Sequence, residues 1–290
     1  MTKDGLILYH HNSSVCAAKI RVALAEKALD FDSRLLRLDG DQFHPEYLAL
    51  NPNAVVPTLV HRGRAVIESN IILEYLEDAF PTPPLRPADP HSRAGARQWM
   101  AMLDGDGGIH HAASVATYAI AYRHHLIARA GSTDRGPLQA AIKSSMNPKS
   151  RSWLQDAVFR GIESAAFREA LFRFDRLFAD LEARLASASW LAGEAYSIAD
   201  VAFTPYLIRL DLLGLDHFWQ ACPAIRDWYA QLRERDSVAA VLSWYDPENI
   251  ELLTTRGRAA AGRVKEMLAE IDGGSGGLSS GGPNAPAPSA

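Results

Sequence analysis

A short segment near the N-terminus places a hydroxyl and a thiol at the start of a predicted helix. Ser14 and Cys16 follow an apolar strand-like run that ends at Tyr9, and helical spacing begins at Ser14. The free N–H groups and positive partial charge of a helix N-terminus stabilise a bound thiolate. Lowering a thiol pKa from about 8.5 to below neutral needs about 2.7 kcal/mol, which a hydroxyl hydrogen bond and the helix dipole can supply. The alternative is that Ser13 or Ser14 only caps the helix.

A second segment, from Asn51 to Leu59, contains a proline at the start of a predicted strand. A cis bond before Pro57 would leave the Val56 backbone N–H and C=O pointing into a cleft, where an extended peptide could pair with them. We therefore predict a cis bond. The alternative is an ordinary trans proline at a strand edge, because most X–Pro bonds are trans.

A third segment places Glu68 and Ser69 where a strand ends and a helix begins. The Ser69 hydroxyl and the N–H groups after it suit a carboxylate, and the Glu68 carboxylate suits an ammonium group. The head group of an amino acid carries both charges, so this pair is a candidate site for one. The alternative is that Ser69 only caps the helix.

Composition narrows the class of protein. The chain has 290 residues, of which 48% are hydrophobic and 22% charged, and this is typical of about two globular domains. The net charge of -4 argues against nucleic-acid binding. We expect no membrane span, because no apolar run reaches about 18 residues, and the run at 6–8 is too short for a signal peptide. Two cysteines without a pairing pattern indicate a reducing, cytoplasmic location. Six of the ten histidines form adjacent pairs, at 10–11, 110–111 and 124–125. Neighbouring side chains point apart on a helix and do not bind one metal together, so we expect no metal.

Short strands and helices alternate in the first part of the chain. Strands are predicted at 5–9, 31–38, 57–61 and 65–67, and helices at 14–28, 44–50 and 69–80. This order is typical of a small mixed sheet with helices on its faces. We therefore expect a first domain at 1–80, a proline-rich linker at 81–91, a helical domain at 92–253, a helical extension at 254–271 and a disordered tail at 272–290. An apolar stripe in the helical part predicts a core-facing helix, with members Phe167, Leu171, Phe174, Phe178, Leu181 and Leu185.

These motifs, in this order, resemble the glutathione transferase superfamily over about residues 5–245. The set is the Ser-x-Cys helix start, the Asn-Pro and Val-Pro segment, the Glu-Ser pair, the proline-rich linker and a capping box from Ser197 to Asp200. The resemblance implies an α/β thioredoxin-like N-terminal domain that binds glutathione. It also implies an all-α C-terminal domain that binds the second substrate, and usually a homodimer.

The resemblance also assigns roles to single residues. It implies that Ser14 is the catalytic serine of zeta-type enzymes and that Cys16 is the cysteine of their Ser-x-Cys pattern. The residues that it places around glutathione are Gln42 at the glycine end, Val56 and Pro57 at the backbone site, and Glu68 and Ser69 at the γ-glutamyl end. The chain departs from the pattern at Ala54, where the family usually has glycine, so we expect that turn to differ.

The activity implied is attack by the glutathione thiolate on a hydrophobic, aromatic electrophile. The motifs resemble those of bacterial β-aryl etherases of lignin breakdown and of tetrachlorohydroquinone dehalogenases, and the chain has an extra stretch at 133–161. These imply ether cleavage or general, detoxifying conjugation, with His110, His111 and Tyr118 as candidate pocket residues. Two alternatives stay open. One is a reductive dehalogenase or thiol oxidoreductase that uses Cys16, and the other is a non-catalytic binding protein on the same fold.

Overall fold

A four-stranded mixed sheet forms the first part of the chain in the computed structural model, which describes residues 5–105, 107–146 and 148–275. In the order β2-β1-β3-β4, its strands are β1 (Leu6–His10), β2 (Phe31–Leu35), β3 (Thr58–His61) and β4 (Arg64–Ile67). β1 runs parallel to β2 and antiparallel to β3, and β3 and β4 form a hairpin. The four predicted strands are confirmed. The prediction that β2 continues to residue 38 is wrong, because its partner β1 ends at His10, which pairs with Leu35.

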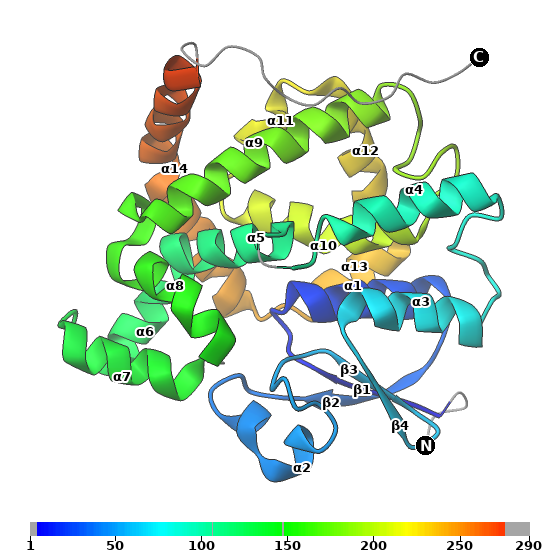
Figure 1. Cartoon of the computed structure of the whole chain (residues 1–290), viewed down its shortest axis with the longest axis horizontal. Helices are drawn as coiled ribbons and strands as arrows, with labels where there is room; N and C mark the ends of the chain where they lie inside the picture. The colour runs from blue at the N-terminus through cyan, green and yellow to red at the C-terminus, as the bar shows by residue number, and fades with distance from the viewer. Residues whose placement is uncertain (1–4, 106, 147, 276–290) are drawn as a thin grey trace.

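Two helices cover one face of this sheet, on the side toward the rest of the chain (Figure 1). They are α1 (Val15–Glu26) and α3 (Ser69–Ala79), whereas η1 (Asp41–Phe43) and α2 (Pro45–Leu48) lie in the β2–β3 connection. α1 is buried along most of its length, since it packs against α3 and also against the helices that follow. This double packing joins the sheet to the helical part through α1.

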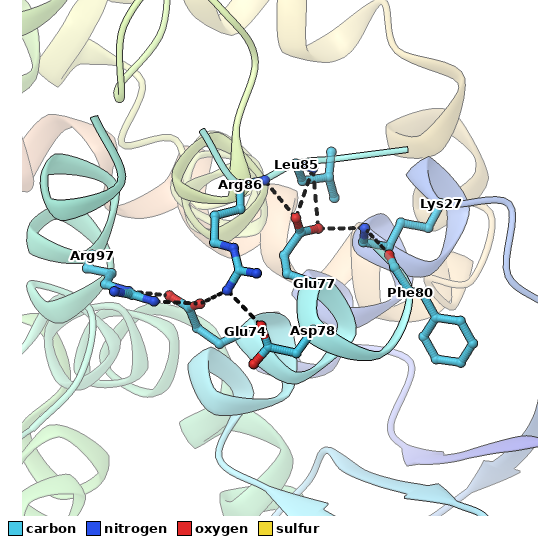
Figure 2. Close-up of polar contacts among 8 residues, drawn as sticks. All are labelled: Lys27, Glu74, Glu77, Asp78, Phe80, Leu85, Arg86 and Arg97. Atoms are coloured by element: carbon cyan, nitrogen blue, oxygen red, sulfur yellow. Dashed lines mark hydrogen bonds and ion pairs between the residues drawn. The ribbon is translucent and has the colours of Figure 1, made fainter. Parts of the chain in front are cut away.

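The proline-rich connection after α3 is held by a buried ion pair. Lys27 Nζ lies 2.6 Å from Glu77 Oε1, and both side chains are buried. Glu77 also accepts hydrogen bonds from the backbone N–H groups of Leu85 and Arg86, and Lys27 donates to the Phe80 carbonyl (Figure 2). This one ion pair therefore holds together the end of α1, α3 and the proline-rich segment that leads to α4.

The remainder of the chain is helical in the residues that the structure describes. The elements are α4 (Pro90–Ala101), α5 (Ile109–Thr117), the π-helix η2 (Tyr118–Tyr122), α6 (Arg123–Ala130), α7 (Arg135–Ser145), α8 (Pro148–Arg160), η3 (Gly161–Glu163), α9 (Ala165–Leu185), α10 (Ile198–Leu212), α11 (His217–Gln220), α12 (Pro223–Arg233), α13 (Asp236–Leu242) and α14 (Pro247–Ser275). α4 begins within the predicted linker, because Asp89 caps it and a proline is favourable at the first helical position. α7 and α8 occupy the extra stretch at 133–161.

Two helical predictions are confirmed in detail. All six members of the apolar stripe lie on α9 and are buried. At the start of α10, Ser197 and Asp200 form the capping box. The Asp200 carboxylate also accepts a hydrogen bond from Trp228 Nε1 at 3.0 Å, so this cap fastens α10 to α12.

The last helix extends further than the sequence predicts. α14 continues to Ser275, so residues 272–275 are helical and the predicted start of a disordered tail at 272 is wrong there. Helix propagation adds one hydrogen bond per residue, which lets a long helix extend into a glycine-containing end. The rest of the predicted tail, 276–290, lies outside the described residues. Among the described helices, none is long and apolar enough to cross a membrane.

Candidate active site

The strand pairing brings the three predicted site segments to one end of the sheet. Tyr9, near the end of β1, pairs with Thr58 at the start of β3, and Thr58 pairs with Ile67 at the end of β4. The segments that adjoin these three residues contain Ser14, Val56 with Pro57, and Glu68 with Ser69, in that order. The register of the sheet therefore explains why these segments, which are far apart in the sequence, lie at the same end of the sheet.

Ser14 caps α1 and faces a cavity. Its hydroxyl oxygen accepts a hydrogen bond from the Ala17 N–H at 3.2 Å, which is the capping role that the sequence left open. The residue is half-buried and borders the cavity described below. Because the capping bond uses a lone pair, the Ser14 hydroxyl proton is still available to donate to a bound sulfur.

Cys16 lies in a small polar cluster with two side chains from the helical part. Its Sγ lies 3.4 Å from His110 Nδ1 and 3.7 Å from Tyr206 Oη, and those two atoms lie 3.4 Å apart. Burial raises the pKa of the Cys16 thiol, but His110, together with Lys19 and Tyr206, outweighs burial and lowers the pKa to about 6. The neighbouring sulfur raises the pKa of His110 despite its burial. The arrangement favours a thiolate beside an imidazolium.

A cavity of about 950 Å³ opens between this end of the sheet and the helices. Residues from five segments border it: His11, Ser13, Ser14 and Val15; Arg37, Leu38 and Asp39; nine residues between His110 and Arg129, which are His110, Ala113, Ser114, Thr117, Tyr118, Tyr122, His125, Leu126 and Arg129; Arg209; and the four residues 246–249. The candidates His110 and Tyr118 are among them, whereas His111 is not and instead accepts a hydrogen bond from the Gly107 N–H. Of the two side chains in the Ser-x-Cys pattern, only Ser14 borders the cavity.

The residues that the family resemblance assigns to glutathione binding are not among those that line this cavity. The Val56–Pro57 bond is cis, as predicted, and both residues are buried. Gln42 is buried and accepts a hydrogen bond from the Gly40 N–H. Exposed Glu68 has a φ of 68° and accepts a hydrogen bond from Asn53 Nδ2 at 3.0 Å, and buried Ser69 begins α3.

The unusual Ala54 keeps a conformation that normally favours glycine. Its φ is 52°, in the left-handed region. Its N–H donates to the Asn51 carbonyl, and the Asn51 side chain bonds the Val55 carbonyl. The hydrogen bonds of Asn51 hold the turn in this conformation, which costs an L-residue about 1 kcal/mol.

Two residues that reasoning from the sequence did not select also belong to the site. Tyr206 contacts Cys16, and Arg209 borders the cavity, and both lie on α10. Arg209 is the one charged residue in the run from Val201 to Leu210, and this is a signal that could have identified it.

Comparison with known proteins agrees with this architecture. Family models of the glutathione S-transferase N-terminal domain and the glutathione S-transferase C-terminal domain match residues 13–79 and 164–231. The β-etherase LigF from Sphingobium sp. strain SYK-6 has a similar structure, with a TM-score of 0.69 and 25% identity, over 82% of this chain and 99% of that one.

Curated relatives cover most of the chain. It is 29% identical over 241 residues to the tetrachloro-p-hydroquinone reductive dehalogenase of Sphingobium chlorophenolicum, covering 79% of this chain and 92% of the relative. It is 28% identical over 240 residues to the glutathione S-transferase GstB of Escherichia coli (strain K12), covering 82% and 97%. With a thioredoxin-like sheet followed by an all-helical part and matches to both family domains, this chain belongs to the glutathione transferase superfamily.

Proposed function

We propose that the protein binds glutathione at the end of the sheet and uses its thiolate to attack a hydrophobic aromatic electrophile in the cavity. The observation that carries the proposal is the position of Ser14. Its hydroxyl caps α1 and borders a cavity that tyrosines of the helical part also border. A sulfur next to Ser14 would receive the hydroxyl proton as a hydrogen bond and would lie near the positive end of α1.

The glutathione backbone would lie across the three segments at this end of the sheet. Val56 would pair with the tripeptide backbone as an added strand does. Ser69 and the first N–H groups of α3 would bind the γ-glutamyl carboxylate, Glu68 would bind the ammonium group, and Gln42 would contact the glycine end.

The cavity would hold the electrophile. Tyr118 and Tyr122 meet edge to face, with ring centroids 5.5 Å apart, and both border the cavity with Leu126. Such a wall suits an aromatic ring. In aryl-ether cleavage the thiolate sulfur would form a bond to carbon while the C–O bond breaks, and the electron pair would leave with the aryloxide oxygen. A halide would leave in the same way from a halogenated substrate.

Two relatives favour these leaving groups. One similar structure is a β-etherase, and one curated relative is a reductive dehalogenase of a chlorinated hydroquinone. A panel of β-aryl ether dimers, halogenated hydroquinones and simple alkyl halides therefore tests the substrate class. Turnover confined to alkyl halides would contradict an aromatic ether or aryl halide as the substrate.

Replacement of Ser14 tests the mechanism. We expect Ser14→Ala to lower kcat on the order of 10²-fold, as removal of an oriented hydrogen-bond donor does. Cys16→Ser is the matched control and should retain most of the activity with a conjugation substrate. Full activity in Ser14→Ala would refute the assignment.

The cluster around Cys16 supports a second candidate function. A thiolate beside His110 could attack the sulfur of a glutathione conjugate, forming a Cys16–glutathione disulfide and releasing the reduced aromatic carbon as a carbanion that takes a proton. A second glutathione thiolate would then release Cys16 and form glutathione disulfide. With halogenated hydroquinones, a Cys16→Ser variant that accumulates the aromatic glutathione conjugate would favour this function, and a variant that turns over normally would exclude it.

A further inference from the structure

Arg209 places a buried positive charge at the cavity wall. Its side chain is buried, with 4% of the residue exposed. Its neighbours on α10, Ile208 and Leu210, are apolar and buried. Its Nη2 donates to the Ser13 carbonyl at 2.5 Å, and its Nη1 donates to the Thr117 hydroxyl at 3.3 Å. Its Nε has no hydrogen-bond partner among the described residues. The hydroxyl groups of Tyr122 and Tyr245 also lie near the guanidinium, but Thr117 and Ser13 accept from only two of its five N–H groups, so it borders the cavity with donor capacity left for a ligand.

No carboxylate of the described residues lies within ion-pair distance of this guanidinium. The acidic residues that border the cavity are Asp39, Asp246 and Glu248, and all three are exposed. A buried charge without a counter-charge is unfavourable, and buried guanidinium groups are usually paired with carboxylates. A ligand that brings a carboxylate into the cavity would supply the missing partner.

The surroundings of Arg209 indicate what else that ligand contains. Its guanidinium carbon lies 5.6 Å from the centroid of the Tyr122 ring, which in turn packs edge to face on Tyr118. The carbonyl that it bonds belongs to Ser13, the residue before Ser14. A ligand on Arg209 would thus lie between an aromatic wall and the residue that we place at the glutathione sulfur.

We infer that Arg209 forms a subsite for a carboxylate carried by the aromatic substrate. The second substrate is then an aromatic acid rather than a neutral aromatic compound. This inference rests on the proposed function, because it places the acid beside the glutathione sulfur. In this arrangement a fork of N–H donors fixes one end of the substrate, which sets the carbon that faces the sulfur.

A purely structural role for Arg209 makes a different prediction. Its two hydrogen bonds also tie the segment before α1 to α5. If this tie were its only role, loss of the side chain would weaken every ligand in the cavity equally. A carboxylate subsite instead predicts a selective loss.

The test measures the affinities of three glutathione derivatives by calorimetry. They are S-benzylglutathione and its para-carboxy and para-carboxamide forms, which share the same tripeptide charges. We expect the wild-type protein to bind the carboxy form about tenfold more tightly than the carboxamide form, as one charged hydrogen-bonded pair allows. Arg209→Met should remove this preference. Arg37→Met is the control, since Arg37 also borders the cavity but is exposed and paired with Asp41, and it should keep the preference.

Each outcome decides the inference. Equal affinities for the carboxy and carboxamide forms in the wild-type protein would overturn it, without any need for a folded variant. An equal loss for all three ligands in Arg209→Met, or in Arg209→Lys where the methionine variant does not fold, would assign Arg209 to the structural role. Binding of S-methylglutathione separates the two proposals. If it binds and no preference is seen, only the subsite is wrong, and if no derivative binds, the proposed function fails as well.

Discussion

At the scale of single residues, Ser14 and Cys16 have different surroundings although they are two positions apart. Ser14 borders the cavity, whereas Cys16 contacts His110 and Tyr206 from the helical part. The Ser-x-Cys pattern thus provides a hydrogen-bond donor at the cavity and a separate thiol whose acidity depends on the other part of the chain. The two candidate functions differ accordingly, since attack by the glutathione thiolate depends on Ser14 and thiol exchange depends on Cys16.

The acidity of Cys16 is open to direct measurement. Its pKa of about 6 lies below the usual thiol value, so the thiolate should form as the pH rises through 6 and be nearly complete at pH 7.5. His110→Gln removes the largest influence that lowers this pKa, and the midpoint should therefore move upward by more than one pH unit. Thiolate absorbance in the ultraviolet, followed against pH, reports this midpoint.

Cys16→Ser is the control for that titration, because it leaves only Cys222, whose pKa burial raises. A wild-type midpoint above pH 8 would contradict an ion pair between Cys16 and His110. The result also bears on function, since a thiol that is neutral at pH 7 would weaken the case for thiol exchange.

At the scale of elements, the ion pair of Lys27 and Glu77 joins α1, α3 and the connection to α4 (Figure 2). Glu77→Gln would leave the Lys27 ammonium buried without its counter-charge. We expect the free energy of unfolding to fall by about 3 kcal/mol, as is typical when one partner of a buried pair is removed. Urea unfolding followed by circular dichroism measures the change.

Figure 2 also shows the matched control for this prediction. Glu74 lies one turn earlier on α3 and pairs with Arg86 and Arg97, but these groups are partly exposed. Glu74→Gln should therefore cost only about 0.5 kcal/mol. Equal effects of the two substitutions would show that burial does not set the strength of the Lys27–Glu77 pair.

At the scale of the whole molecule, we predict a homodimer, as the family resemblance implies, with the first domain of one chain against the helical domain of the other. Ile71 on α3 is 59% exposed, more than the other large apolar side chains that are exposed among the described residues. Covering it would favour association. Light scattering at micromolar concentration should give twice the mass of the chain, and Ile71→Glu should lower that mass. A monomer mass for the wild-type protein would refute the prediction.

The sequence by itself determined the strands and helices of the first domain, the buried stripe of α9 and the cap of α10, and it supplied most of the candidate site residues. Short apolar runs specified the strands, because a run of four to eight apolar residues is typical of a buried strand, and the spacing of the stripe on α9 specified its buried side. The order of the Ser-x-Cys, Val-Pro and Glu-Ser motifs indicated the superfamily. Each motif and each periodic run is a signal within one segment of the chain, and the order of the motifs needs no knowledge of which segments are in contact.

Only the tertiary structure decided which of those residues act together. His110 and Tyr206 lie 94 and 190 positions from Cys16, and no local pattern links their spacing to that thiol. The same holds for Arg209, which reaches the Ser13 carbonyl 196 positions away. Such contacts arise because α1 packs against α10, and helix packing depends on side-chain shape across the whole core rather than on neighbours in the sequence.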